Sequence, residues 1–177
     1  MLLSLFLFAL LADAPQAQSP VVTFDVATQL ASEGHNEEAL AAFERLAAQN
    51  PDDLQARLWI ARLHERLGHP DRAEPVYRSV FLEDPRNVDA IYGAGSALLA
   101  LDRIGESIEV LERAADLAPD NVDVLVALGR AHGILGHAGE SASYLGRAAQ
   151  LAPTPQNQVA HEQAVLATRH HLNIRYG

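Results

Sequence analysis

Four prolines recur at a fixed interval, and this spacing constrains the fold more than any other feature of the sequence. Pro51, Pro85, Pro119 and Pro153 are each separated by 34 residues. With 9 prolines in 177 residues, three successive matches would arise by chance roughly once in 10⁴. A constant interval of this length is typical of repeat proteins, in which each unit stacks on its neighbours and shares a core with them.

Each unit contains two apolar patterns of helical period, separated by a short turn. The third turn, at Leu101-Asp102-Arg103, has no glycine, so we expect it to be strained or closed differently. The other turns are expected at Gly34, Gly68 and Gly136, and the residues expected to cap helices are Asn36, Asp52 or Asp53, Asn87, Asn121 and Thr154. The sequence thus predicts four helix-turn-helix units, at 20–53, 54–87, 88–121 and 122–155.

Positions that are 34 residues apart also share side-chain size. A small slot in each first helix holds Ala27, Ala61, Gly95 and Gly129. In each second helix a small slot holds Ala39, Ala73, Ser107 and Ser141, and a large slot holds Phe43, Tyr77, Leu111 and Leu145. Small residues facing large ones let neighbouring helices interlock closely.

The 34-residue helix-turn-helix period and this size pattern resemble the tetratricopeptide repeat family over residues 20–155. The resemblance implies an all-α, right-handed α-solenoid. One departure concerns the tryptophan that the family usually carries early in each unit. That slot holds Thr23, Arg57, Ile91 and Leu125, whereas the single tryptophan, Trp59, lies two residues later. We therefore expect the second unit to pack unusually.

The C-terminal segment continues beyond the fourth unit. Residues 156–171 predict a capping helix, with Val159, Gln163, Leu166 and His170 on one stripe. Residues 172–177 alternate between polar and apolar side chains, which is the period of a strand. Two interpretations of this tail stay open: a frayed end, or the beginning of a β-domain.

The N-terminus resembles a secretory signal peptide. Residues 1–12 are almost all apolar, but as a helix Leu2 to Ala12 would span only about 16 Å of a hydrocarbon layer of about 30 Å. Small and polar residues follow, so we expect residues 1–17 to be removed, with cleavage after Ala12, Ala14 or Ala17. The alternative is a short hydrophobic helix packed on the first unit. The mature chain is expected to contain no transmembrane helix.

Composition excludes several classes of function. The net charge of −10 argues against nucleic acid as a partner, because its binders need a basic surface. The absence of cysteine excludes disulfides and thiolate chemistry. All 13 basic residues are arginines, which favour planar contacts with carboxylates.

No motif in the sequence indicates catalysis, a cofactor or a metal. His35, His69 and His137 share a turn slot, and His64 and His132 share a core slot. Residues in one slot lie about 10 Å apart per unit and cannot share an ion. His161, His170 and His171 could at most hold an adventitious metal. Gly93-Ala94-Gly95 lacks the third glycine and the preceding strand of a dinucleotide site. We therefore expect that the protein is not an enzyme and that it binds neither a cofactor nor a metal.

The resemblance does imply a binding surface, because the first helices of this family line a concave groove. Slots 34 apart would form parallel rows along it: an apolar row (Phe24, Leu58, Tyr92, Val126), a row with two arginines (Thr28, Arg62, Ser96, Arg130) and a polar row (Val21, Gln55, Asp89, Asp123). Together with Arg66, these rows predict a cradle for a partner peptide that carries an acidic group. The alternative is that these side chains pack against neighbouring units or face water. The family's lysine and asparagine clamp for C-terminal carboxylates is not matched, since the chain has no lysine.

We therefore expect a non-enzymatic scaffold of a bacterium that binds a protein or peptide partner. The scaffold is expected to be periplasmic or secreted. The alternative is an outer-membrane-associated arrangement, in which the array is the periplasmic arm of a β-barrel secretion or polysaccharide-export component. An accessory role in the cytoplasm remains if the N-terminus is not cleaved.

Overall fold

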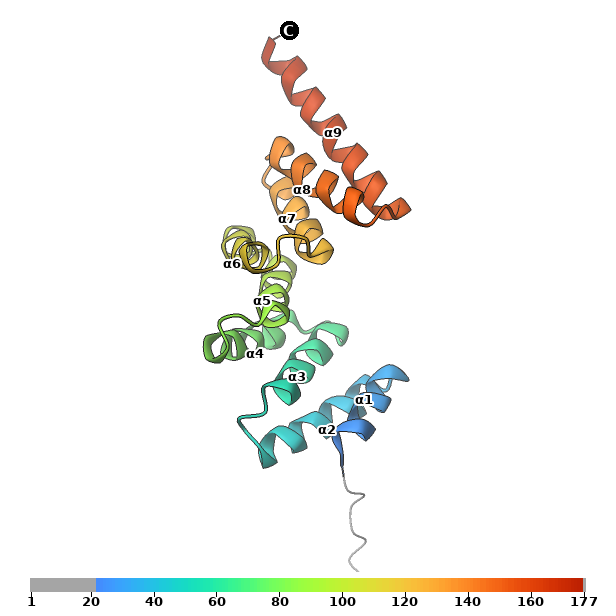
Figure 1. The fold of residues 1–177 in the computed structure, drawn as a ribbon, viewed down its shortest axis with the longest axis vertical. Helices are drawn as coiled ribbons and strands as arrows, with labels where there is room; N and C mark the ends of the chain where they lie inside the picture. The colour runs from blue at the N-terminus through green and yellow to red at the C-terminus, as the bar shows by residue number, and fades with distance from the viewer. Residues whose placement is uncertain (1–21, 177) are drawn as a thin grey trace, which may run out of the picture.

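The computed structural model of the protein describes residues 22–176, and all of its regular structure there is helical (Figure 1). These residues form nine helices: α1 (Phe24–Ser32), α2 (Asn36–Gln49), α3 (Leu54–Arg66), α4 (Pro70–Glu83), α5 (Val88–Ala100), α6 (Ile104–Leu117), α7 (Val122–Ile134), α8 (Ala138–Leu151) and α9 (Pro155–Tyr176). The predicted all-α fold is confirmed. The expected signal peptide, at residues 1–17, and Val21 lie outside the described residues.

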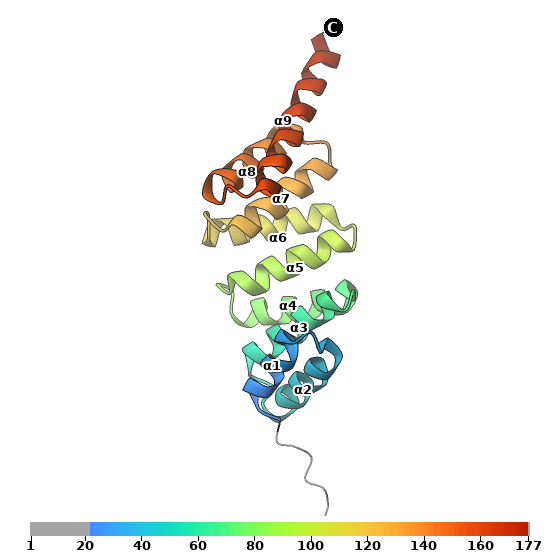
Figure 2. The ribbon, with the colours of Figure 1, turned by 90° about the vertical axis from the view of Figure 1, so that its right-hand side faces the viewer.

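The helices stack in chain order. Each helix contacts the next one, and the first helices of successive pairs also touch, α3 with α5 and α5 with α7. Figures 1 and 2 show an elongated array with α1 and α2 at one end and α9 at the other. This arrangement is an α-solenoid, in which each helix pair contacts mainly its neighbours.

Side-chain caps begin the first helices where the sequence predicts them. Asp53, Asn87 and Asn121 each accept hydrogen bonds from backbone N–H groups in the first turn of the following helix. The expected cap at Asn36 is wrong. Residue 35 occupies the cap position of α2 without a side-chain bond, and the Oδ1 atom of Asn36 is buried with no partner. The four periodic prolines, Pro51, Pro85, Pro119 and Pro153, lie in the links that follow each helix pair. Each therefore marks the end of a unit.

The four turns within the pairs share one backbone geometry. Gly34, Gly68 and Gly136 have φ values of 86°, 78° and 76°, in the left-handed region that glycine tolerates best. The third turn places Asp102 in this region instead, with φ of 60°. The expected strain at this turn is therefore confirmed, since a Cβ atom disfavours this conformation.

Replacing Asp102 with glycine is expected to raise the free energy of unfolding by about 0.5–1 kcal/mol, because it removes the steric conflict at the Cβ atom. Urea denaturation followed by circular dichroism measures the change. Gly68→Asp is the matched control, since it introduces the same conflict into the second turn and should destabilise the array. An Asp102→Gly variant no more stable than the parent would contradict this account.

The predicted size pattern produces close helix crossings. A Cβ atom on Gly95 would lie 2.6 Å from Cγ of Leu111, and one on Gly129 would lie 2.6 Å from Cγ of Leu145. A real Cβ atom does not approach another carbon so closely, so both crossings need glycine. The buried small slots of the second helices add one hydrogen bond each: Ser107 and Ser141 donate to the carbonyls of Gly95 and Gly129, both at 2.7 Å.

The buried side chains form two clusters along the array. One cluster joins α1, α2 and α3 around Phe43, which packs edge-on against Phe24 and is stacked with Trp59 at a centroid distance of 5.3 Å. The other runs from α3 to α7 through Tyr77 and Leu111. The sequence led us to expect unusual packing in the second unit. The stack of Trp59 on Phe43 is such packing, and it links the second unit to the first.

Two predictions about the C-terminal segment are wrong. Residues 172–176 are helical, so α9 continues through the segment whose alternation predicted a strand. The stripe of the expected capping helix also faces outward, because Val159 and Leu166 are 51% and 53% exposed. Instead α9 packs on α8 through the opposite side, where Ala164 is buried and His161 contacts the Ala142 carbonyl oxygen at 3.2 Å.

Candidate functional site

A hollow of about 340 Å³ lies between the first helices of the third and fourth pairs. Its lining comes from one face of α5 and one face of α7: Tyr92, Ser96, Leu99, Ala100, Asp123, Val126, Ala127, Arg130 and Ile134. Five of the ten predicted groove residues therefore meet in one place: Tyr92, Ser96, Asp123, Val126 and Arg130. Their helices touch directly, so positions 34 residues apart become neighbours across the hollow.

Sequence reasoning missed four members of the lining, Leu99, Ala100, Ala127 and Ile134. They lie on the same helix faces as the predicted residues, three to eight positions further along. A signal was present, because helical spacing from Tyr92, Asp123 and Val126 reaches them. The three rows that the sequence suggested were too narrow to include them.

The hollow is lined by a positive charge from Arg130, a negative charge from Asp123, and the hydroxyl groups of Tyr92 and Ser96. Burial raises the pKa of Tyr92, and the nearby carboxylates of Asp123 and Glu65 raise it further, while Arg130 acts in the opposite direction. Arg130 is exposed, and among the side chains that the structure describes we find no hydrogen bond, ion pair or aromatic contact for its guanidinium group. The group is therefore free to bind a carboxylate from another molecule.

The two arginines predicted further towards the N-terminus are engaged within the chain. Nη2 of Arg62 lies 2.7 Å from Oδ2 of Asp89, and its guanidinium group lies over the Trp59 ring. Arg66 donates to the carbonyl of Ala31 at 3.0 Å and also contacts Trp59. These contacts bridge the first three helix pairs, so Arg62 and Arg66 stabilise the array rather than face a ligand.

The predicted apolar row is also interrupted at this end. Leu58 is 2% exposed and belongs to the core, so its prediction as a groove residue is wrong. Phe24 packs against Phe43, and the hydroxyl of Thr28 donates to the backbone of Asp25. Gln55 is exposed but is not part of the lining of the hollow. Of this row, only Leu58 is fully buried, and only Tyr92 and Val126 line the hollow.

A partly buried polar pair links α3 and α4 on the N-terminal side of the hollow. The hydroxyl of Tyr77 donates to Oε2 of Glu65 at 2.6 Å. Burial raises the pKa of Glu65, and burial together with the Glu65 carboxylate raises that of Tyr77. The pair connects α3 with α4 and holds the Tyr77 ring in place. The sequence did not indicate it, because the two residues occupy unrelated slots.

Two histidines from different slots come together, which slot spacing alone did not suggest. Nδ1 of His132 lies 3.4 Å from Nδ1 of His137, and the His132 ring stacks on Tyr144. Within the described part of the chain, no group of three or more potential ligands could hold a metal ion.

His64 occupies the same core slot in the second pair, and burial lowers its pKa below the ordinary value of 6.5. Arg72 and His69 act in the same direction as burial, whereas Glu44 and Asp71 oppose it. The unfolded chain therefore binds more protons than the folded one just below pH 6.5. The free energy of unfolding should rise with pH through this window.

Replacing His64 with glutamine is expected to flatten this part of the pH profile, because the variant has no imidazole that must stay neutral when buried. Urea titrations between pH 5 and pH 7.5 measure the slope for both proteins. His35→Gln is the control, since His35 is exposed and faces Glu38. Parallel profiles for the parent and His64→Gln would show that His64 is not responsible.

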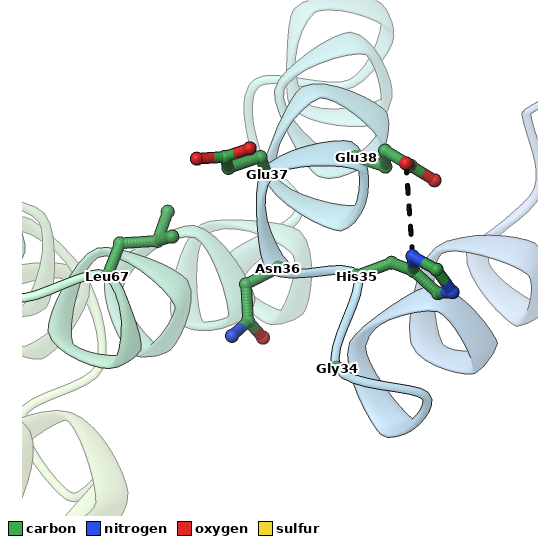
Figure 3. A pocket seen from close by; sticks show the side chains of 6 residues that line it. All are labelled: Gly34, His35, Asn36, Glu37, Glu38 and Leu67. Carbon is green, nitrogen blue, oxygen red and sulfur yellow. Dashed lines mark ion pairs between the residues drawn. The ribbon is translucent and has the colours of Figure 1, made fainter.

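A second hollow, of about 320 Å³, lies at the first turn and is built differently. Figure 3 shows His35 and Glu38 facing each other, with Nδ1 and Oε1 3.8 Å apart, and Asn36 turned away from both. The remaining lining residues are Gly34, Glu37 and Leu67. The polar groups do not converge on one point, so we assign no binding role to this hollow.

Stacked helix pairs with an open hollow between their first helices define a repeat scaffold of the α-solenoid class. Two tetratricopeptide repeat profiles match the sequence, one over residues 30–86 and the other over 60–122 and again over 92–158. The chain belongs to the tetratricopeptide repeat family. Members of this family are generally non-enzymatic scaffolds for protein–protein interaction. A comparison with curated proteins found no match.

Solved structures share the fold at low sequence identity. A thermophilic tetratricopeptide repeat protein of Thermus thermophilus is 24% identical, with a TM-score of 0.70 over 81% of this chain and 80% of that one. MamA of Desulfovibrio magneticus is 20% identical, with a TM-score of 0.71 over 85% and 92%. YrrB, described as having an unusual peptide-binding site, is 13% identical, with a TM-score of 0.70 over 78% and 71%.

Proposed function

We propose that the protein is an envelope scaffold that binds a peptide segment of a partner protein in the hollow between α5 and α7. The observation that carries this proposal is the arrangement around Arg130. An unengaged guanidinium group lies beside the apolar surface of Val126 and the hydroxyls of Tyr92 and Ser96. Such a surface suits an acidic group flanked by backbone and apolar side chains.

Asp123 gives the bound segment an orientation. Its carboxylate lines the same hollow as Arg130 but lies two helical turns earlier on α7. A carboxylate of the partner would pair with Arg130, while backbone N–H groups or a basic side chain would lie near Asp123. The fold is shared with YrrB, whose peptide-binding site supports a peptide as the type of ligand.

Replacing Arg130 with glutamate is expected to abolish partner binding without unfolding the array, because Arg130 is exposed and makes no ion pair with the side chains that the structure describes. A photo-crosslinking residue at Val126 should give one discrete adduct in cells, and the Arg130→Glu change should remove it. A crosslinker at Arg45, an exposed residue on α2, is the control and should give no such adduct. Identical adducts from both positions, or an adduct that survives Arg130→Glu, would contradict the proposal.

The placement in the envelope rests on residues 1–17, whose apolar run followed by small residues is typical of a signal peptide. No helix within residues 22–176 combines the length and the apolar character that a membrane span needs. The alternating tail was one feature that fitted the outer-membrane alternative, and because residues 172–176 are helical this feature does not support it. Mass spectrometry of the protein from its native cell tests export. A chain that retains Met1 in the cytoplasmic fraction would overturn this placement.

A further inference from the structure

A third hollow, of about 330 Å³, adjoins the proposed peptide site at the C-terminal end of the array. It lies where α7, α8 and α9 meet, and Arg130 lines both hollows. Most of its remaining surface is small and apolar: Gly129, Gly133, Gly136, Ala138, Ser141, Leu145, Ala160, Gln163, Ala164 and Ala167. A ligand that reaches Arg130 from the first hollow therefore has an apolar recess on the other side.

The repeat explains why this recess exists. Adding 34 to Val126 and Arg130 gives Ala160 and Ala164, so α9 has alanine at two positions where the earlier units carry larger side chains. At position 133 a glycine stands where the third unit has Leu99. The stacking of α9 on α7 and α8 thus continues the line of the proposed site but removes the side chains that would fill it.

The wall formed by α9 is held in place by hydrogen bonds to α8 and to the link before it. His161 contacts the carbonyl of Ala142 at 3.2 Å, in a space that Gly146 leaves open. The hydroxyl of Thr168 donates to the carbonyl of Ala138 at 3.0 Å, and Asn157 donates to that of Ala152 at 2.9 Å. A preformed recess of this kind binds without first ordering its walls.

We propose that this recess, defined by Ala160, Ala164 and Ala167 of α9 with Gly133 of α7, receives one large apolar side chain of the partner segment. The segment places an aspartate or glutamate on Arg130 and a leucine, methionine or phenylalanine in the recess. The proposal rests on the proposed function, because both share Arg130. It commits to an acidic partner because Arg130 is an unengaged cation at the rim, and to an apolar anchor because alanine and glycine line the interior.

Two substitutions separate the anchor from the acid. Ala167→Leu fills the recess from an exposed position, and Arg130→Gln removes the charge. The matched controls are Ala48→Leu and Arg45→Gln, both at exposed positions on α2. A phage-displayed library of random dodecapeptides is the probe, selected against the untagged full chain and each variant. Circular dichroism confirms that every variant remains folded, and Ala160→Leu provides a second filling variant.

The parent chain is expected to select peptides with an acidic residue within two positions of a large apolar one. For such a peptide, Ala167→Leu should weaken binding by about 10-fold or more, since the apolar side chain stays in water. Peptides selected on Ala167→Leu should keep the preference for an acidic residue and lose the preference for a large apolar one. Peptides selected on Arg130→Gln should keep the apolar preference and lose the acidic one.

The outcomes distinguish the two proposals. Peptides that depend on Arg130 but bind Ala167→Leu and Ala160→Leu as well as the parent would overturn the anchor recess and leave the peptide site standing. Failure of the parent chain to select any peptide, or equal loss in the α2 controls, would overturn both.

Discussion

Replacing Phe43 with alanine is expected to lower the free energy of unfolding of the N-terminal part of the array by about 3–5 kcal/mol. The Phe43 side chain is fully buried, and its ring contacts both Phe24 and Trp59. Its removal leaves a cavity between α1, α2 and α3. Because repeat arrays are stabilised mainly by neighbouring units, the loss should be concentrated at this end.

The single tryptophan makes this local effect measurable. Trp59 fluorescence reports on the N-terminal cluster, whereas far-ultraviolet circular dichroism reports on all helices. In the Phe43→Ala variant, the fluorescence transition in urea should shift to lower concentration than the main circular dichroism transition. Leu82→Ala is the control, because Leu82 is 68% exposed and its loss should change stability by less than about 0.5 kcal/mol. Coincident, equally shifted transitions would show that the array unfolds as one unit.

Replacing Gly93 with alanine is expected to lower the free energy of unfolding by about 2–3 kcal/mol through overpacking. A Cβ atom at this position would overlap the ring of Tyr77. The ring has little room to move, since it is 2% exposed and its hydroxyl is bonded to Glu65. Helices α4 and α5 would therefore have to separate at the centre of the array.

Gly105→Ala is the matched control for this prediction. Gly105 lies in the first turn of α6, and nothing lies within 4 Å of the position its Cβ atom would take. Alanine there should stabilise the array by about 0.5–1 kcal/mol through helix propensity. Thermal denaturation of both variants gives opposite signs if close packing at Gly93 is the cause. A loss of stability in both variants would point to a general effect of replacing glycine in these helices.

The repeat period allowed much of the fold to be predicted, since its signals are local or depend only on equivalent positions. Pro85 lies in the link between α4 and α5, where it favours the end of α4, and Asn87 caps the helix that follows. Asp102 is strained because of its own backbone conformation. Gly95 and Leu111 occupy the small and large slots of one unit, and the contact between these slots could be predicted because the slots recur in every unit. None of these features requires knowledge of distant contacts.

The proposed site was only half predictable. Equivalent positions identified Tyr92 and Arg130 correctly as neighbours of one hollow. They did not show that Arg62 would be neutralised by Asp89 or that Leu58 would be buried. Equivalence in a repeat states which residues correspond, but the side chains of adjoining units decide which of them remain accessible. Those side chains differ from one unit to the next.

The C-terminal segment shows the same limit. Six alternating residues favoured a strand, but no glycine or proline separates residues 172–176 from the preceding helix, so α9 continues through them. The sequence by itself determined the units, their turns and their close crossings, because each depends on local conformation or on a constant period. Only the tertiary structure decided which arginine stays free and which face of α9 is covered, because both depend on contacts between residues that no local pattern relates.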